Sequence, residues 1–139
     1  TKESIEVAVS YIKSNSIYFE IEEDFFNKND IHIHFTEGAT HKDGPSAGIA
    51  IVTAILSSIK NKTISSEISM TGEITLKGDI LKVGGIKEKS IASVRNKINK
   101  LYISEENKSD ILWLDNCLKD SIKYIFVDNY KKIYEEIFL

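Results

Sequence analysis

The sequence predicts one domain of mixed α/β structure, in which helices pack against sheets that contain some parallel strand pairs. Its 139 residues with 42% hydrophobic content suffice for a single core, and no break in composition divides residues 1–139 into two domains. Segments with strand and helix periodicity also alternate through the second half of the chain, which favours parallel pairing.

The first predicted elements are a helix and a strand. Ile5, Val9 and Ile12 recur at helical spacing, so residues 2–14 are expected to form an amphipathic helix with one apolar stripe. Around residues 31–36, apolar side chains alternate with polar ones. That period of two is typical of a strand with one buried face.

The next elements are a buried helix and a pair of strands. Residues 46–60 are apolar on most faces, which indicates a buried helix with Ser46 in its first turn. Pro45 suits the start of a helix, where its missing N–H costs nothing. Residues 67–83 resemble strands joined by a turn at 77–79.

The second half of the chain alternates between helix and strand. The expected elements are a helix at 86–98, a strand at 101–103, a short helix at 107–115, a strand at 122–127 and a closing helix at 130–138.

Composition excludes several classes of protein. The net charge is −3, the pI is near 5.6, and the 18 basic residues are spread along the chain, so a nucleic-acid partner is not expected. No apolar run is long enough to span a bilayer, and the N-terminus lacks a signal-peptide layout.

Cysteine and histidine give no sign of a metal site. Cys117 stands alone, which excludes a disulfide framework, fits a reducing compartment and predicts a core-filling role. His32 and His34 share a predicted strand face, but no third ligand accompanies them, so we expect a structural role.

The stretch GATHKDGPSAGIA, residues 38–50, raises the question of what Ser46 does. Its Gly44–Gly48 segment matches the G-x-S-x-G elbow of α/β-hydrolases. Those enzymes place their histidine after the serine, whereas all three histidines here precede it. A His-Asp-Ser order through Asp43 would crowd the base and the acid into one strand and loop, so we disfavour it as well.

A serine with a lysine base is the remaining arrangement. Burial must lower the lysine pKa from about 10.4 toward neutrality for it to accept a proton. The segment KVGGIKEKSIASV offers Lys87 and Lys89, which lie about 200° apart on a helix, so only one can face inward. Ala92 and Ser93 follow Lys89 on a small-residue face, but the surroundings of Lys87 are no worse, and periodicity leaves both open.

Two long motifs then identify a family. EGATHKDGPSAG, followed by MTGEITLKGDILKVGGIKEK, resembles the proteolytic domain of Lon, the ATP-dependent AAA+ protease of bacteria and mitochondria, and the resemblance covers nearly the whole chain. It implies the Lon proteolytic-domain fold and a serine endopeptidase that degrades unfolded or damaged proteins in protein quality control. It also implies a Ser-Lys dyad acting through an acyl-enzyme, with Ser46 as nucleophile and Lys89, not Lys87, as base.

The resemblance assigns supporting roles too. It implies that Thr71 hydrogen-bonds Lys89, and that Asp43, with Gly44 and Pro45, belongs to a loop whose conformation opens or blocks the site. We expect the oxyanion to be stabilised by backbone N–H groups at the start of the Ser46 helix.

The sequence around Ser46 also contains two glycines and one residue that differs from the family motif. Gly44 and Gly48 are expected to let the substrate backbone approach closely. The sequence departs from the family at His41, where Pro is usual, and this changes the stiffness expected of the loop without removing a catalytic group.

The resemblance extends to the surroundings of this domain. It implies that the chain begins inside the domain, and that an AAA+ region outside it binds ATP and Mg and supplies ATP dependence; no Walker A pattern occurs here. No cofactor is expected in the domain itself. The implied partners are unfolded proteins and further copies in a homohexameric ring, in a mitochondrial matrix or, alternatively, in bacterial cytoplasm.

Four other interpretations are kept open. The fold could serve as a non-catalytic assembly or substrate-binding module, or the chain could be another Ser-Lys hydrolase. Ser46 alone could be a helix cap, and Thr71 alone a buried strand residue.

Overall fold

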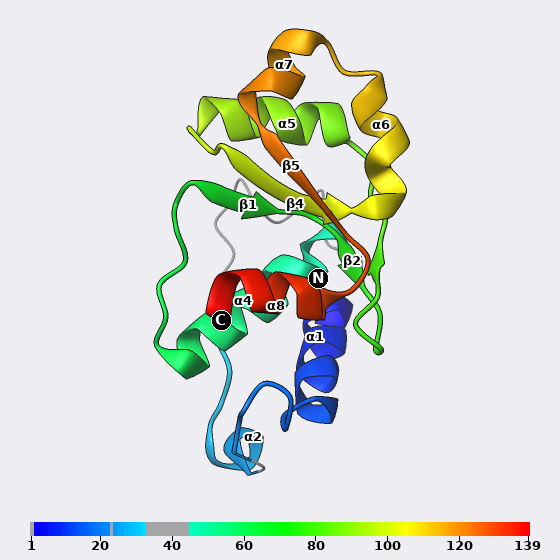
Figure 1. The fold of residues 1–139 in the computed structure, drawn as a ribbon. Coiled ribbons are helices and arrows are strands. Elements are labelled where there is room, and N and C mark those ends of the chain that lie inside the picture. The colour runs from blue at the N-terminus through cyan, green and yellow to red at the C-terminus, as the bar shows by residue number, and fades with distance from the viewer. Residues whose placement is uncertain (1, 23, 33–44) are drawn as a thin grey trace.

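A parallel sheet of three strands lies at the centre of the molecule (Figure 1). Its strands are β1 (Ile68–Met70), β4 (Lys100–Ser104) and β5 (Lys123–Val127), in the order β1-β4-β5. In the middle of the sheet, Tyr102 of β4 pairs with Met70 on one side and Ile125 on the other. Parallel strands are joined by crossovers, which here place helices on both faces. The mixed α/β architecture and its parallel pairs are therefore confirmed.

The structure is a computed structural model that describes residues 2–22, 24–32 and 45–139. Its helices are α1 (Lys2–Ser14), α2 (Phe25–Lys28), α4 (Gly48–Lys60), α5 (Ile86–Arg95), α6 (Lys108–Leu112), α7 (Asn116–Ser121) and α8 (Tyr130–Phe138), with 3-10 turns η1 (Pro45–Ala47) and η2 (Glu105–Asn107). Within the described ranges, no helix has both the length and the apolar character to cross a membrane.

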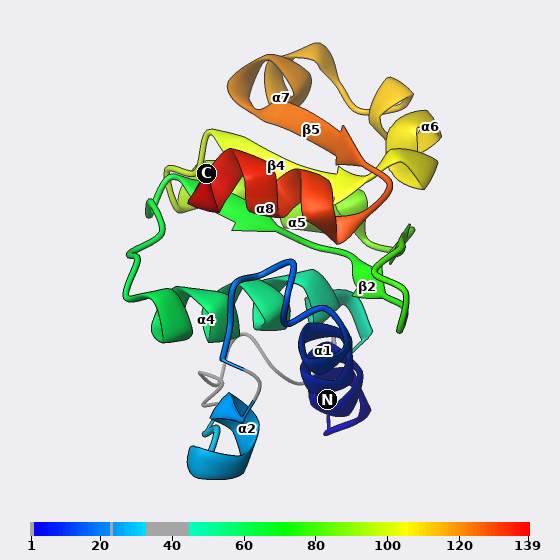
Figure 2. The ribbon, with the colours of Figure 1, turned by 60° about the horizontal axis from the view of Figure 1, so that its bottom comes forward.

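Side chains of β4 alternate between two hydrophobic cores, because successive residues of a strand point to opposite faces. The larger core joins α1, α4 and α8 beneath the sheet, and its buried members include Tyr11, Ile12, Ile49, Val52, Leu56, Tyr102, Tyr130 and Ile133. The smaller core lies on the other face, under α5, α6 and α7, and consists of Ile86, Leu101, Ile103, Ile111, Leu114 and Ile122. Figures 1 and 2 show these helices on opposite sides of the sheet.

A two-stranded hairpin stands beside this sheet. β2 (Glu73–Ile74) and β3 (Ile80–Leu81) pair antiparallel through the predicted turn at 77–79. The predicted strands of residues 67–83 are therefore divided between two sheets, since β1 belongs to the parallel one.

The helix that carries Ser46 begins later than predicted. Residues 45–47 form the 3-10 turn η1, and the α-helix starts at Gly48. The Ser46 carbonyl accepts the Gly72 N–H from outside the helix, at 2.9 Å, which holds this turn against the chain that follows β1. The placement of Ser46 in the first α-helical turn is therefore wrong by two residues.

The predicted helix at 86–98 ends early, at Arg95. Lys97 takes a left-handed conformation with φ of 60°, and the Ile98 N–H returns to the Ser93 carbonyl at 2.8 Å. This is a helix stop of the kind that usually uses glycine. Because no Gly or Pro marks this helix end in the sequence, the periodic pattern predicted a helix that continues to residue 98.

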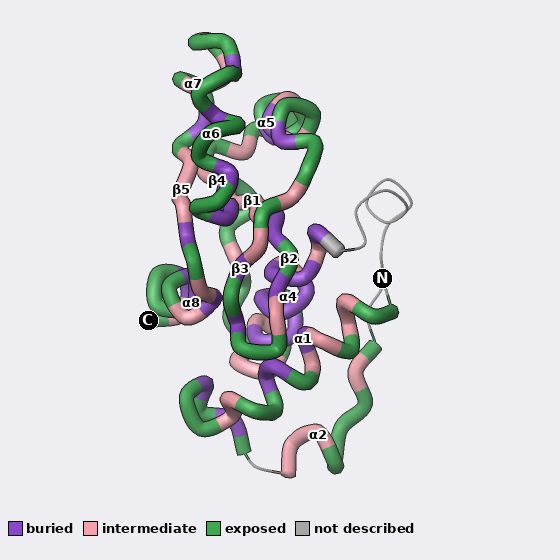
Figure 3. Tube along the Cα trace, turned by 90° about the vertical axis from the view of Figure 1, so that its right-hand side faces the viewer, coloured by how far each residue is buried: buried purple, intermediate pink, exposed green. Residues whose placement is uncertain are grey.

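Two short helices were not predicted, α2 and α7, and residues 107–115 contain only the end of η2 and α6. Cys117 lies exposed on α7 and does not fill the core, so that expectation is wrong. The reason is that α7 contacts the smaller core through half-buried Leu118, and the neighbouring residue on a helix points about 100° away. Figure 3 shows α7 largely exposed and α4 largely buried.

The predicted strand at 31–36 is only partly covered by the structure. Ile31 and His32 are described and belong to no strand, while residues 33–36 lie outside the described residues.

Candidate active site

Ser46 is held in a buried turn at the start of α4. Its carbonyl oxygen accepts from the Gly72 N–H and, at 3.4 Å, from the Thr71 hydroxyl, and only 8% of the residue is exposed. A Cβ on Gly48 would lie 2.9 Å from the backbone nitrogen of Ile74. This close approach requires glycine and brings η1 against the residues that link β1 to β2.

Lys89 is half-buried on α5, and the buried face of that helix lies beside it. Ile86 and Ser90 are buried there, and the Tyr124 hydroxyl donates to Ser90 Oγ at 2.8 Å. Burial raises the pKa of Tyr124, which keeps its hydroxyl a neutral donor. Lys87, by contrast, is exposed.

One pocket of about 440 Å³ brings the predicted residues together. Its lining includes the nucleophile candidate Ser46, the supporting candidate Thr71 and the base candidate Lys89, whereas Lys87 does not contribute. The remaining lining residues are Ala47, Ala50, Ser69, Met70, Ala92, Ser93, Asn96, Ile98 and Leu101. A hydroxyl and an amine in one partly enclosed pocket are the groups that general-base activation of a serine needs.

The wall around Lys89 consists of the small residues that the sequence indicated. Ala92 and Ser93 line the pocket beside Lys89, and the Ser93 hydroxyl donates to the Lys89 carbonyl at 2.9 Å. Sequence reasoning missed Met70, Ala50 and Asn96. The spacing of Ala50 one turn after Ser46 could have indicated it, since residues four apart share a helix face.

Thr71 lines the same pocket as Ser46 and Lys89, the two predicted members of the dyad. Its hydroxyl donates to the Ser46 carbonyl, and a hydroxyl can still accept a hydrogen bond while it donates one. The predicted hydrogen bond between Thr71 and Lys89 is compatible with this arrangement and stays a prediction.

One expectation about the serine turn is narrowed and another needs correction. The Ile49 N–H, in the first turn of α4, already donates to the Gly72 carbonyl at 3.2 Å, so the oxyanion donors expected at the start of this helix do not include it, and that expectation stays a prediction. The side of Gly48 where a Cβ would stand is filled by Ile74, so this glycine serves packing and not the approach of a substrate backbone.

Several other candidate residues precede Ser46 in the sequence. Pro45 begins the 3-10 turn, whereas Asp43 and Gly44, together with His34 and His41, lie outside the described residues. His32 is exposed. Across the part of the chain that the structure describes, no three His, Cys, Asp or Glu side chains gather as a metal site would require.

Comparison with known proteins gives a family for the whole chain. A family model described as the Lon protease (S16) C-terminal proteolytic domain matches residues 1–139. The Lon protease of Finegoldia magna is 45% identical over 138 residues, which cover 99% of this chain and 18% of that protein.

Other bacterial relatives match in the same way. The Lon protease of Rhizobium meliloti is 48% identical over 132 residues, covering 95% of this chain and 16% of that protein. The Lon protease of Malacoplasma penetrans is 42% identical over 137 residues, covering 99% and 18%. The chain therefore spans less than about a fifth of the length of these relatives, in keeping with a match to one domain.

Proposed function

The chain belongs to the family of Lon protease C-terminal proteolytic domains, and from that premise we propose that it cleaves peptide bonds as a serine endopeptidase with a Ser46-Lys89 dyad. The observation that carries the proposal is the single pocket lined by Ser46, Thr71 and Lys89, from which Lys87 is absent. Family membership makes proteolysis the expected chemistry, and the pocket supports one particular pair of residues.

In the proposed reaction, neutral Lys89 accepts the proton of the Ser46 hydroxyl as Ser46 Oγ attacks the scissile carbonyl. Collapse of the tetrahedral intermediate breaks the C–N bond, and Lys89 returns its proton to the leaving amine. A water molecule then attacks the acyl-enzyme, again with Lys89 as base, and releases the carboxylate product and Ser46.

The negative charge on the intermediate needs hydrogen-bond donors. We assign this role to backbone N–H groups at the start of the Ser46 helix, apart from the Ile49 N–H, which donates to the Gly72 carbonyl. The N-terminal end of α4 also carries the positive end of its helix dipole, which favours an anion there.

Thr71 is proposed as a positioning residue that touches both sides of the dyad. It holds the Ser46 carbonyl by its hydroxyl hydrogen and would accept a hydrogen bond from Lys89 on its oxygen. Asp43, Gly44 and Pro45 are proposed to control access to the pocket from the preceding loop.

The wider protein follows from the family. We propose that ATP and Mg bind an AAA+ region outside this domain, that the whole protein forms a homohexameric ring, and that its substrates are unfolded proteins. Since the relatives described above are bacterial, we propose bacterial cytoplasm as the compartment and set aside the mitochondrial matrix.

The test is ATP-stimulated cleavage of an unfolded protein by the full-length parent protein. Ser46→Ala and Lys89→Ala should each lower the rate by about 10³-fold or more, because each removes a group that the acyl transfer requires. Lys87→Ala is the matched control and should retain near wild-type cleavage, while ATPase activity and ring assembly persist in all three variants.

Two results would redirect the proposal. Near-normal cleavage by Lys89→Ala would show that another residue is the base. If neither the wild type nor Ser46→Ala cleaves the unfolded protein, and a serine-directed phosphonate labels neither, the chain is a non-catalytic assembly or substrate-binding module and not a protease.

A further inference from the structure

A second pocket, of about 700 Å³, continues from the candidate active site. Ala50, Ser69 and Met70 line both pockets, so the two share a boundary and form one continuous depression. We call the second pocket the α4–β1 groove. Its lining residues are Ala50, Thr53, Ala54, Ser57, Asn61, Lys62, Thr63, Ile64, Ile68, Ser69 and Met70.

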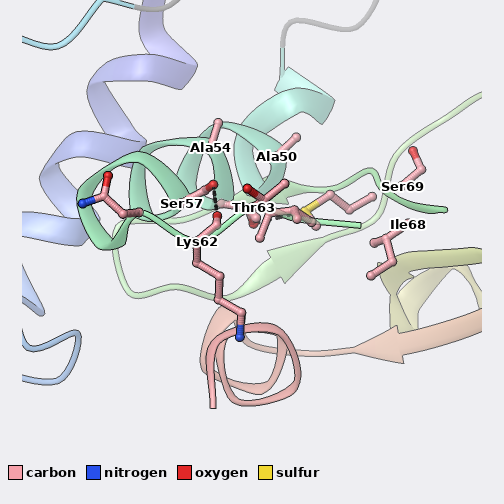
Figure 4. A pocket seen from close by; sticks show the side chains of 11 residues that line it. Ala50, Ala54, Ser57, Lys62, Thr63, Ile68 and Ser69 are labelled. Carbon is pink, nitrogen blue, oxygen red and sulfur yellow. Dashed lines mark hydrogen bonds between the residues drawn. The ribbon is translucent and has the colours of Figure 1, made fainter. Parts of the chain in front are cut away.

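The groove runs along α4 past Ala50, Ala54 and Ser57 (Figure 4). In the sequence this direction leads away from Ser46. Ala50, Ala54 and Ser57 have the spacing of one helix face, and they form the α4 wall. From Ala50 to Ser57 the helix rises about 10 Å. An extended peptide advances about 3.3 Å per residue, so the groove has the length of about three residues.

The chemistry of the lining favours uncharged side chains. Small or apolar residues and hydroxyls make up most of it, and Lys62 is the one charged residue in the set. Its side chain turns away from the groove toward α8 in Figure 4, where Nζ lies 5.9 Å from the centre of the Phe138 ring. Among the described residues, the groove therefore offers apolar surface and hydroxyl groups, and no charge that faces it to pair with an acidic or basic residue.

The junction between the two pockets has a fixed floor. Thr53 Oγ1 donates to the Ile49 carbonyl at 2.9 Å and lies 2.6 Å from the Tyr130 hydroxyl and 3.1 Å from Met70 Sδ. Tyr130 is fully buried, and burial raises its pKa, so its hydroxyl remains a neutral donor at this contact. Thr53, which contacts α8 through Tyr130, thus holds Met70 at the boundary.

The proposed mechanism decides which part of a substrate the groove would face. Lys89 and its neighbours Ala92, Ser93 and Asn96 form the α5 wall of the active-site pocket. Because Lys89 returns a proton to the leaving amine, that amine lies on the α5 side. The acyl portion then lies on the opposite side, where Ala50 and Met70 open into the groove.

We propose that the α4–β1 groove binds the acyl-side segment of an extended substrate, from about the third to about the fifth residue before the cleaved bond. The segment that fits is uncharged and apolar, which is the chemistry of a protein interior exposed by unfolding. This inference rests on the proposed function. Remote binding of this kind accelerates cleavage when it helps to hold the scissile bond in place.

The experiment compares three internally quenched peptides with the same cleaved bond, using the full-length parent protein with ATP. The first has two residues before that bond, the second adds three leucines, and the third adds three aspartates. The wild type should cleave the leucine peptide with a kcat/KM about tenfold above the other two, which corresponds to about 1.4 kcal/mol.

Two variants narrow the groove from opposite walls. Ala54→Leu adds volume on α4 at an exposed position that a leucine suits, and Thr63→Trp does so on the exposed loop opposite. Each should remove the advantage of the leucine peptide and leave cleavage of the short peptide within about twofold of wild type. If both variants lose the advantage of the leucine peptide, the cause is the narrowed groove, because one substitution's effect on folding would not be shared by the other.

Ser58→Leu is the matched control on the same helix. Ala54 also borders a separate cavity of about 260 Å³ next to Phe25 and Ile31, and Ser58 lines that cavity without lining the groove. The control should cleave all three peptides as the wild type does. Equal loss in Ser58→Leu would assign the effect to the other cavity and overturn the inference.

The remaining outcomes separate this inference from the function on which it rests. If a serine-directed phosphonate labels Ser46 but the leucine extension gives no advantage, or the advantage survives in Ala54→Leu and Thr63→Trp, the groove does not bind substrate. If Ser46 is not labelled and no peptide is cleaved, the proposed function fails and the inference falls with it.

Discussion

The two walls of the candidate active site are supported in different ways. The Ser46 wall continues into α4, whose Ile49, Val52 and Leu56 are fully buried in the larger core. The Lys89 wall is α5, which contributes Ile86 to the buried part of the smaller core and is held also by the hydrogen bond that Ser90 Oγ accepts from the Tyr124 hydroxyl. Ser46, the proposed nucleophile, is therefore fixed by extensive apolar packing, whereas Lys89, the proposed base, depends on a few individual contacts.

This difference changes what a substitution should do on each side. A defect behind Ser46 weakens packing shared by α1, α4 and α8, so it should appear mainly as lost stability. A defect behind Lys89 disturbs the orientation of one helix, so it should appear more in the rate of cleavage. Each of the following predictions compares the two walls.

The largest effect is expected from truncating an apolar side chain behind each wall. Ile49→Ala should lower the free energy of unfolding by about 2–5 kcal/mol, because the residue is fully buried among close neighbours. Ile86→Ala, at the edge of the smaller core, should cost less, but it should lower kcat more than Ile49→Ala does at a temperature where both are folded. Urea unfolding measures the free energy of unfolding, and steady-state cleavage measures kcat. If the two variants lose equal stability and equal kcat, the two walls are not supported differently.

A smaller effect is expected from adding a methyl group next to the serine turn. Gly48→Ala places a Cβ 2.9 Å from the Ile74 nitrogen, a backbone atom that cannot move cheaply, so unfolding should become easier by about 1–3 kcal/mol. Gly84→Ala, before α5, is the control because no atom lies within 4 Å of its Cβ. In thermal unfolding, the stability of Gly84→Ala should lie within about 0.5 kcal/mol of wild type. If Gly84→Ala lost as much stability as Gly48→Ala, the cause would be the restricted backbone of alanine and not crowding of its Cβ.

The smallest effect on stability is expected from removing one hydroxyl behind Lys89. Tyr124→Phe loses the 2.8 Å hydrogen bond to Ser90 and should cost about 0.5–1.5 kcal/mol. Its kcat should fall several-fold while KM changes little, since α5 orients the base. Tyr134→Phe, whose hydroxyl lies 3.5 Å from the Phe19 carbonyl in the larger core, should leave kcat unchanged. A KM change in Tyr124→Phe without a change in kcat would contradict a positioning role.

Much of the fold could be predicted because its elements carry strong periodicity. The helix at 2–14, the strands near 101–103 and 122–127 and the closing helix at 130–138 all appear close to their predicted bounds. The failures are short elements, α2 and α7, and the end of α5 at Arg95. These depend on a few hydrogen bonds and a left-handed residue, and such features leave little trace in a hydrophobic pattern.

The candidate site divides in the same way. Sequence alone predicted the mixed α/β architecture, singled out Ser46, and offered Lys87 and Lys89 as candidate bases, with the family resemblance favouring Lys89. Only the tertiary structure decided that Lys89 and Ser46 line one pocket, that Ile49 gives its amide to Gly72, and that a groove leads away along α4. The physical reason is that periodicity specifies which face of an element is buried, whereas a pocket forms between elements far apart in the chain.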